Sequence, residues 1–203
     1  MTRVLPPTAE GIATAAEILR GGGVVAIPTD TVYGVAVAWD RADRLPVLYA
    51  LKRRPPEKQI AALVAGLDQV RQLGWTADER AARLAEAFWP GALTLVLGGA
   101  AGPSGPTQGF RAPDHTVTLA LIRAAGPLLA TSANLSGEPE ALDADDVLVA
   151  FATQQGELDA VVNGGRVPGG EPSTVLDLTG ERARVLRTGP LTTEELAGVV
   201  GLG

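Results

Sequence analysis

Ten polar side chains fall at or near the ends of predicted strands and helices, where they can face a common ligand. The set is rich in hydrogen-bond donors and poor in acids. Arg recognises a carboxylate or phosphate through paired hydrogen bonds, Lys adds a compact charge, and hydroxyl and amide groups add short directional bonds. Such a pocket fits a polyphosphate together with a carboxylate. The ten residues are Thr31, Tyr33, Lys52, Arg54, Lys58, Arg111, Ser132, Asn134, Ser173 and Arg187.

The sequence offers no obvious catalytic triad. It contains no Cys and a single His, and His115, which follows Pro113-Asp114, suits a surface helix cap equally well. A reaction with little acid–base work therefore fits best, such as attack on a nucleotide phosphate by a nucleophile that is already anionic. In such a reaction the protein mainly positions the reactants and stabilises charge.

Composition narrows the class of protein. The chain of 203 residues is 46% hydrophobic and 20% charged, which predicts one globular domain over residues 1–203. A net charge of −6 argues against a protein that mainly grips a nucleic-acid backbone, but it leaves room for a local basic pocket. No apolar run reaches the roughly 18 residues of a membrane span, and the N-terminus lacks the apolar centre of a signal peptide. We expect a soluble cytoplasmic protein without a structural zinc site.

Two polar turns interrupt the predicted core strands. Apolar runs at residues 24–27 and 32–38 predict buried strands that flank the corner Pro28-Thr29-Asp30-Thr31. A second turn, at residues 131–137, follows a predicted strand at residues 128–130. Each turn is either a ligand site or an ordinary bonded turn, since Ser, Asn and Asp are common turn formers. We expect Asp30 to hold the shape of its corner rather than to contact a substrate.

A dense group of cations follows the second predicted helix. That helix starts near Asp43, tolerates Pro46 in its first turn and ends before Pro55. Four of the 17 basic residues fall within residues 52–58. They are either solvated charges at a helix C-terminus or part of an anion site.

The remaining pattern mixes helices and strands. Helices are predicted at residues 8–20, 78–88, 116–125, 143–153 and 192–199, the last with a capping box of Thr192 and Glu195. Strands are predicted at residues 60–65, 93–97, 160–163, 173–178 and 184–186, with the last two paired around residues 179–181. Residues 98–109, rich in Gly and Pro, form either a mobile lid or a plain loop. This alternation indicates an α/β or α+β domain with a mixed, twisted sheet.

Several motifs in order give the chain a close resemblance to a known family. Over about residues 8–190 it resembles the YrdC-like family of L-threonylcarbamoyladenylate synthases, in the short form without a further C-terminal domain. The motifs are Pro28-Thr29-Asp30-Thr31-Val32-Tyr33-Gly34, Lys52-Arg53-Arg54-Pro55, Phe88-Trp89-Pro90-Gly91, Arg111-Ala112-Pro113-Asp114-His115, Thr131-Ser132-Ala133-Asn134-Leu135-Ser136-Gly137, Pro172-Ser173-Thr174-Val175 and Val185-Leu186-Arg187-Thr188-Gly189.

The resemblance implies a fold and an activity. The fold would be a twisted mixed parallel and antiparallel sheet, flanked by helices, with a large basic cavity. The activity would be that of a nucleotidyltransferase: L-threonine, bicarbonate or CO2, and ATP with Mg²⁺ would give threonylcarbamoyl-AMP and pyrophosphate. A separate complex would then transfer the threonylcarbamoyl group to an adenosine next to the anticodon of certain tRNAs.

The resemblance also implies a role for each matching residue. The catalytic signature falls on Lys52, Arg54, Ser132 and Asn134. L-Threonine would be held by Thr31, Tyr33, Arg111, Ser132 and Ser173, with Arg111 on its carboxylate. ATP would contact Lys52, Arg54, Lys58, Thr107, Asn134 and Arg187. No metal ligand is expected from the protein side chains.

The chain departs from the family pattern at several positions. Lys58-Gln59-Ile60 stands where Lys/Asn-Pro-Leu is common, Leu63 where some members have a His, Ala92 where a Pro is usual, and Glu140-Ala141-Leu142 where Ser-Pro-Thr often follows. The core signature is intact, but one hydroxyl near the nucleotide is missing. Two other functions stay open: a paralogue that forms a different carbamoyl-adenylate, and a double-stranded-RNA-binding factor in translation or ribosome maturation with weak RNA binding.

Overall fold

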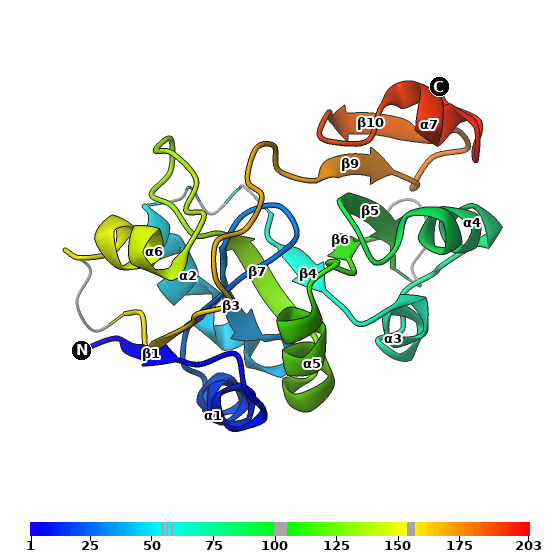
Figure 1. The fold of residues 1–203 in the computed structure, drawn as a ribbon. Helices are drawn as coiled ribbons and strands as arrows, with labels where there is room; N and C mark the ends of the chain where they lie inside the picture. The colour runs from blue at the N-terminus through cyan, green and yellow to red at the C-terminus, as the bar shows by residue number, and fades with distance from the viewer. Residues whose placement is uncertain (54, 56, 58, 100–104, 154–156) are drawn as a thin grey trace.

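A long mixed sheet forms the frame of the molecule (Figure 1). The computed structural model describes residues 1–53, 55, 57, 59–99, 105–153 and 157–203. Within these residues ten strands share one sheet, in the order β1-β8-β2-β3-β7-β4-β6-β5-β9-β10. The strands are β1 (Arg3–Leu5), β2 (Val25–Ile27), β3 (Gly34–Ala38), β4 (Ala61–Leu63), β5 (Leu93–Gly98), β6 (Thr107–Arg111), β7 (Leu128–Ser132), β8 (Ala160–Val162), β9 (Thr174–Asp177) and β10 (Arg184–Arg187).

Both parallel and antiparallel pairs occur in this sheet. β8 pairs in parallel with β1 and β2, and β4 with β6, whereas β2–β3, β3–β7 and β5–β6 are antiparallel. The predicted mixed sheet is therefore confirmed. The predicted pairing of the last two strands is also confirmed, because β9 and β10 are antiparallel neighbours.

Apolar side chains cover both faces of the central strands. Val35 and Val37 of β3 point into one core cluster, while Ala36 and Ala38, which alternate with them, point into a second cluster on the other face. Successive side chains of a strand alternate between faces, so a strand buried on both faces must be apolar throughout. This explains why β2 and β3 read as uninterrupted apolar runs in the sequence.

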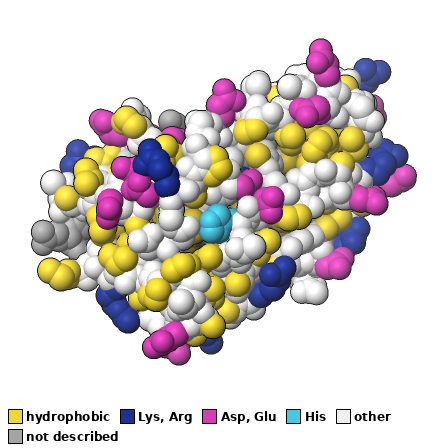
Figure 2. Space-filling view, in the orientation of Figure 1, with side chains coloured by type: hydrophobic (Ala, Val, Ile, Leu, Met, Phe, Trp, Pro, Cys, Tyr) yellow, Lys and Arg dark blue, Asp and Glu magenta, His cyan; other side chains and the backbone are white. Residues whose placement is uncertain are grey.

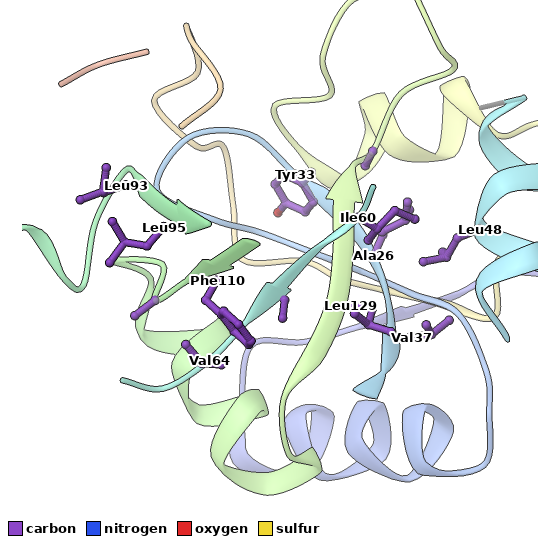
Figure 3. Close-up of a cluster of buried hydrophobic side chains, with 14 of the residues drawn as sticks. Ala26, Tyr33, Val37, Leu48, Ile60, Val64, Leu93, Leu95, Phe110 and Leu129 are labelled. Atoms are coloured by element: carbon purple, nitrogen blue, oxygen red, sulfur yellow. The ribbon is translucent and has the colours of Figure 1, made fainter. Parts of the chain in front are cut away.

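Helices close the two faces. α1 (Ala9–Arg20) and α5 (Thr116–Ala125) lie side by side over one face (Figure 1). The first cluster, on the other face, includes residues of α2 (Leu45–Lys52), α3 (Leu67–Gln72), α4 (Glu79–Phe88), α6 (Ala144–Ala150) and α7 (Thr193–Ala197). Figure 3 shows Leu48, Ile60 and Phe110 of this cluster gathered along the strands.

Side chains cap the starts of several helices. The Thr8 hydroxyl accepts a hydrogen bond from Gly11 N at the start of α1, and Asp78 accepts one from Ala81 N at the start of α4. Thr192 and Glu195 form the predicted capping box of α7. Each cap satisfies a backbone N–H that the first helical turn leaves without a partner.

Some predicted boundaries are wrong. A 3₁₀ segment, η1 (Trp39–Arg44), precedes α2, so the α-helix begins at Leu45 and not near Asp43. The predicted helix at residues 143–153 ends at Ala150. The predicted loop at residues 98–109 contains the start of strand β6, and its residues 100–104 lie outside the described part of the chain. The short elements β1 and α3 were not predicted.

Candidate functional site

A cavity of about 320 Å³ opens where the strands of the middle of the sheet meet the two polar turns. Six of the ten predicted site residues line it. They are Thr31, Tyr33, Arg111, Ser132, Ser173 and Arg187. Arg54 and Lys58 lie outside the described residues. Lys52 and Asn134 lie behind the wall rather than in it, as described below, and Thr107 begins β6 without joining the lining.

The first wall is the corner at residues 28–31, between β2 and β3. The buried Thr29 hydroxyl donates to Val32 O at 2.7 Å and accepts from the backbone N–H groups of Thr31 and Val32. The two readings of this corner are therefore compatible: it is an internally bonded turn, and it also lines a cavity. Its own hydrogen bonds leave Thr31 fixed at the cavity wall.

Tyr33 adds a buried ring to the same wall. Its Oη donates to Gly165 O at 2.7 Å and accepts from Gly164 N at 3.1 Å, which ties the start of β3 to the loop after β8. Burial raises the pKa of Tyr33, partly offset by the hydrogen bond from Gly164. The phenol therefore stays protonated at neutral pH, and the side chain lines the cavity.

Arg111 ends β6 and carries the cation of this wall. Its Nη2 lies 2.6 Å from Asp30 Oδ1, its Nη1 donates to Thr31 Oγ1 at 3.1 Å, and its Nε donates to Gly91 O at 3.0 Å. The side chain is only 8% exposed. Burial lowers the pKa of Arg111, the nearby Asp30 carboxylate raises it, and Arg187 lowers it. The guanidinium is thus held in one orientation from three sides.

Asp30 acts through Arg111 rather than inside its own turn. The hydrogen bonds that shape the corner come from Thr29, and Asp30 is not among the residues that line the cavity. The expectation that Asp30 holds the corner's shape is therefore corrected: its ion pair joins the corner to the end of β6.

The second wall is the turn that begins at the end of β7. Ser132 belongs to the strand, which runs further than predicted, and its Oγ donates to Asn134 Oδ1 at 2.6 Å. Lys52 Nζ, at the end of α2, donates to Thr131 Oγ1, Ser132 Oγ and Asn134 Oδ1 at 3.1–3.3 Å, and also to Ser132 O. Asn134 Nδ2 donates in turn to Glu138 O at 2.6 Å.

Lys52 is therefore a support behind Ser132. It is only 2% exposed, so the reading of this residue as a solvated charge at a helix end is wrong. An ammonium can be buried only when its N–H groups find acceptors, and the turn supplies several of them. The structure brings together Lys52, Ser132 and Asn134, three of the four predicted signature residues.

The third wall joins β9, β10 and β5. Ser173 Oγ lies 2.8 Å from the hydroxyl of Thr94 in β5, and Arg187 Nε and Nη2 donate to Ser173 O at 3.0 and 2.8 Å. A residue predicted to bind threonine thus contacts one predicted to bind ATP. Several other residues line the cavity without a site role predicted from the sequence. They include Thr29, Gln59, Thr94, Thr131 and Glu140.

The charge of the cavity differs from the expectation. Its described lining carries two arginines, Arg111 and Arg187, and one acid, Glu140, among many apolar and hydroxyl groups. The predicted basic character is not shown by these residues and stays a prediction. On the face seen in Figure 2, acidic and basic side chains intermingle, and the described residues form no continuous basic patch there.

His115 is placed at the N-terminus of α5 but does not cap it. Its side chain makes no capping hydrogen bond, and Nδ1 is buried without a partner among the described residues. Burial lowers the pKa of His115, while Asp30 and Asp114 raise it. Of the readings that the sequence left open, a helix cap made by the His115 side chain is not what the structure shows, and His115 is not among the residues that line the cavity.

Two other classes of site have no support among the described residues. No group of three or more His, Cys, Asp and Glu side chains could hold a metal ion there. None of the helices in the described part of the chain is long and apolar enough to span a bilayer.

Comparison with known proteins decides the family. Residues 17–189 match the family model named for Sua5, YciO and YrdC, which is described as telomere recombination. The chain belongs to this Sua5/YciO/YrdC family. The predicted resemblance is confirmed, and so is the predicted fold class.

Two curated relatives illustrate the similarity in sequence. A threonylcarbamoyl-AMP synthase of Bacillus subtilis is 38% identical over 94% of this chain, which spans 56% of that protein. A putative threonylcarbamoyl-AMP synthase of Mycobacterium leprae is 38% identical over 96% of this chain and 90% of its own length. The chain thus spans little more than half of the first relative and most of the second.

Solved structures of the family superpose closely. Pyrococcus abyssi Sua5 complexed with L-threonine has a TM-score of 0.87 and 31% identity, and covers all of this chain and 62% of its own. Escherichia coli YciO has a TM-score of 0.83 and 25% identity, and covers 97% of this chain and all of its own. A HypF structure at 20% identity shares the fold alone.

Proposed function

We propose that this chain is an L-threonylcarbamoyladenylate synthase, a nucleotidyltransferase that converts L-threonine, bicarbonate or CO2, and ATP into threonylcarbamoyl-AMP and pyrophosphate. The observation that carries the proposal is the buried, oriented guanidinium of Arg111, in one cavity with the hydroxyls of Thr31, Ser132 and Ser173. The likeness to a Sua5 structure with bound L-threonine supports it.

Arg111 can bind a carboxylate without losing its present partners. A guanidinium has five N–H donors, and Asp30, Thr31 and Gly91 take three of them. Two donors remain for the carboxylate of threonine. Because Arg111 is already oriented, little conformational entropy is lost when the substrate binds.

The chemistry then needs few proton transfers from the protein. The neutral amine of threonine adds to CO2 and loses one N–H proton to water, which gives a carbamate whose oxygen carries negative charge. That oxygen attacks the α-phosphorus of ATP, a P–O bond forms to the carbamate, and the P–O bond to pyrophosphate breaks. Arg187 lines the cavity and would bind phosphate oxygens, while Ser132 and its support Lys52 would hold the reacting groups in place.

The remaining assignments stay predictions. Asn134 and Thr107 are proposed contacts to ATP, although neither is among the residues that line the cavity. Arg54 and Lys58 have the same proposed role and lie outside the described residues. Mg²⁺ is proposed to arrive with ATP and to neutralise part of the triphosphate charge, since Mg²⁺ is commonly held by phosphates, waters and only one or two carboxylates.

The partners of the reaction are proposals as well. The product is a mixed anhydride, so its threonylcarbamoyl group is activated for transfer to a nucleophile. A separate transfer complex acting on tRNA is the proposed acceptor. Weak RNA binding and a cytoplasmic location also stay predictions.

One assay tests the proposed function. The protein is incubated with ATP, bicarbonate and L-threonine, and pyrophosphate release and threonylcarbamoyl-AMP are measured. We expect both products to require threonine. Release that does not depend on threonine would indicate a different carbamoyl-adenylate, and no release would refute the proposal. A gel shift across a salt series separates the RNA-binding alternative, because phosphate contacts make binding steeply salt-dependent.

A further inference from the structure

Glu140 presents a carboxylate to the cavity in an unusual state. It lines the cavity wall, and its Oε2 is buried without a hydrogen-bond partner among the described residues. A buried carboxylate oxygen without a partner is costly, and folded proteins leave few such groups. An oxygen in this state is therefore prepared for a ligand that the protein itself does not supply.

The backbone on both sides of Glu140 is fixed. Tyr33 N donates to Ala141 O at 2.9 Å, and Asn134 Nδ2 donates to Glu138 O at 2.6 Å. Val167 N donates to Leu142 O at 2.8 Å. The segment is thus tied to β3, to the turn after β7 and to the loop after β8, and these bonds fix the backbone that carries Glu140 at the cavity wall.

A cation in the bound state would stabilise the carboxylate of Glu140. A carboxylate that faces a triphosphate and a substrate carboxylate repels both. Arg111 is already paired with Asp30, and Arg187 donates to Ser173. Besides the basic side chains already proposed to contact ATP, the reaction brings two cations that could pair with Glu140: the ammonium form of threonine, or Mg²⁺ bound to ATP.

The proposed reaction excludes the ammonium as the productive partner. A carboxylate that pairs with the threonine ammonium raises the pKa of that ammonium, because an opposite charge nearby stabilises the charged form. The threonine nitrogen then keeps its proton. The nitrogen must lose that proton before it adds to CO2. Mg²⁺ has the opposite preference, since it binds triphosphates together with one or two carboxylates.

We propose that Glu140 is a ligand, directly or through a water molecule, of the Mg²⁺ bound with ATP. This assignment rests on the proposed function. It gives the chain one protein contact to the metal, supplied by the segment in which the sequence departs from its family. It also explains why this segment can lack the hydroxyl that is common in the family. The Glu140 carboxylate would contact ATP through Mg²⁺ instead.

Nucleotide binding without turnover tests the assignment. The ligand is an ATP analogue with a methylene bridge between the α- and β-phosphates, titrated by calorimetry with and without Mg²⁺. The variant is Glu140→Gln, and the matched control is Glu138→Gln, an exposed residue of the same segment. With Mg²⁺ we expect Glu140→Gln to bind the analogue roughly tenfold more weakly than the wild type.

Without Mg²⁺, the effect of Glu140→Gln on affinity for the analogue should have the opposite sign. Without Mg²⁺, Glu140→Gln should bind the analogue at least as tightly as the wild type, because it removes a negative charge from an anion site. This measurement also shows that the variant is folded. Binding of Mn²⁺ in the presence of the analogue, followed by electron paramagnetic resonance, should weaken in Glu140→Gln and stay unchanged in Glu138→Gln.

Three outcomes overturn the assignment. An equal gain from Mg²⁺ in the wild type and Glu140→Gln would show that Glu140 does not contact the ion. A loss of threonine affinity with unchanged Mg²⁺ dependence would place Glu140 on the substrate ammonium. Failure of the wild type to bind the analogue under any condition would refute the proposed function itself, and the assignment with it.

Discussion

Each of the two polar turns beside the cavity holds a buried cation, but the relation between turn and cation differs. At the corner of residues 28–31, Asp30 and Thr31 fix the planar guanidinium of Arg111 in one orientation. At the turn after β7, the compact ammonium of Lys52 draws Thr131, Ser132 and Asn134 together. Arg offers a rigid fork, whereas Lys offers a point charge with rotatable donors. The corner at residues 28–31 therefore orients Arg111, whereas Lys52 organises the turn after β7.

Removal of the oriented cation should have the largest effect. In Arg111→Ala we expect kcat/KM for threonine to fall about a thousandfold, or about 4 kcal/mol, because two charge-assisted hydrogen bonds to the substrate carboxylate are lost. Threonine-dependent pyrophosphate release measures it. Arg123→Ala, an exposed arginine of α5, is the matched control and should keep wild-type activity. A loss below threefold in Arg111→Ala would remove Arg111 from the site.

Removal of Lys52, the cation that organises the second turn, should have the second-largest effect. Lys52→Met leaves the oxygens of Ser132 and Asn134 without their shared donor, so the turn loses its shape. We expect pyrophosphate release to fall about a hundredfold, the typical cost of a misplaced catalytic group. The free energy of unfolding in urea should fall by about 2 kcal/mol. The control is Arg53→Met, an exposed neighbour. Unchanged stability with lost activity would show that Lys52 contacts substrate instead of organising the turn.

Loss of the orienting acid should have a smaller and different effect. In Asp30→Asn, Arg111 keeps its hydrogen bonds to Thr31 and Gly91 but loses the partner that fixes its third side. We expect KM for threonine to rise about tenfold while kcat stays within twofold, since about 1.4 kcal/mol of orientation is lost. Asp30→Glu should restore part of the affinity, and the exposed Asp40→Asn should change neither constant. An equal fall in kcat would contradict a positioning role.

The same two turns show what the sequence can and cannot predict. The strands β2 and β3 were recognisable because both of their faces are buried and every residue is apolar. The turns were recognisable as polar interruptions of such runs. The family motifs then named Thr31, Arg111 and Ser132, which the structure brings to one cavity.

The contacts between these residues could not be predicted. Asp30 and Arg111 are 81 residues apart, and only the order of strands in the sheet brings them together. Thr94 was missed because it lies inside an apolar strand, where a single hydroxyl reads as a β-branched core residue. β1 was missed because it has three residues, two of them exposed, and its apolar pattern is too short to recognise.

The smallest expected effect is a change in the pKa of His115, which should respond to one turn and not to the other. His115 is the single histidine, and the Asp30 carboxylate raises its pKa against the lowering by burial. Asp30→Asn should therefore lower the pKa of His115 further, whereas Lys52→Met at the other turn should leave it unchanged. The imidazole Cε1–H resonance, followed by NMR against pH, measures both.

The sign of the matching stability change follows from proton linkage. Because the pKa of His115 is lowered in the folded state, the unfolded chain binds the proton more readily, and stability is lost as pH falls through the unfolded value of about 6.5. Asp30→Asn should enlarge this acid loss, and His115→Gln should remove it. A pKa of His115 that does not fall in Asp30→Asn would contradict an action of the Asp30 carboxylate on His115.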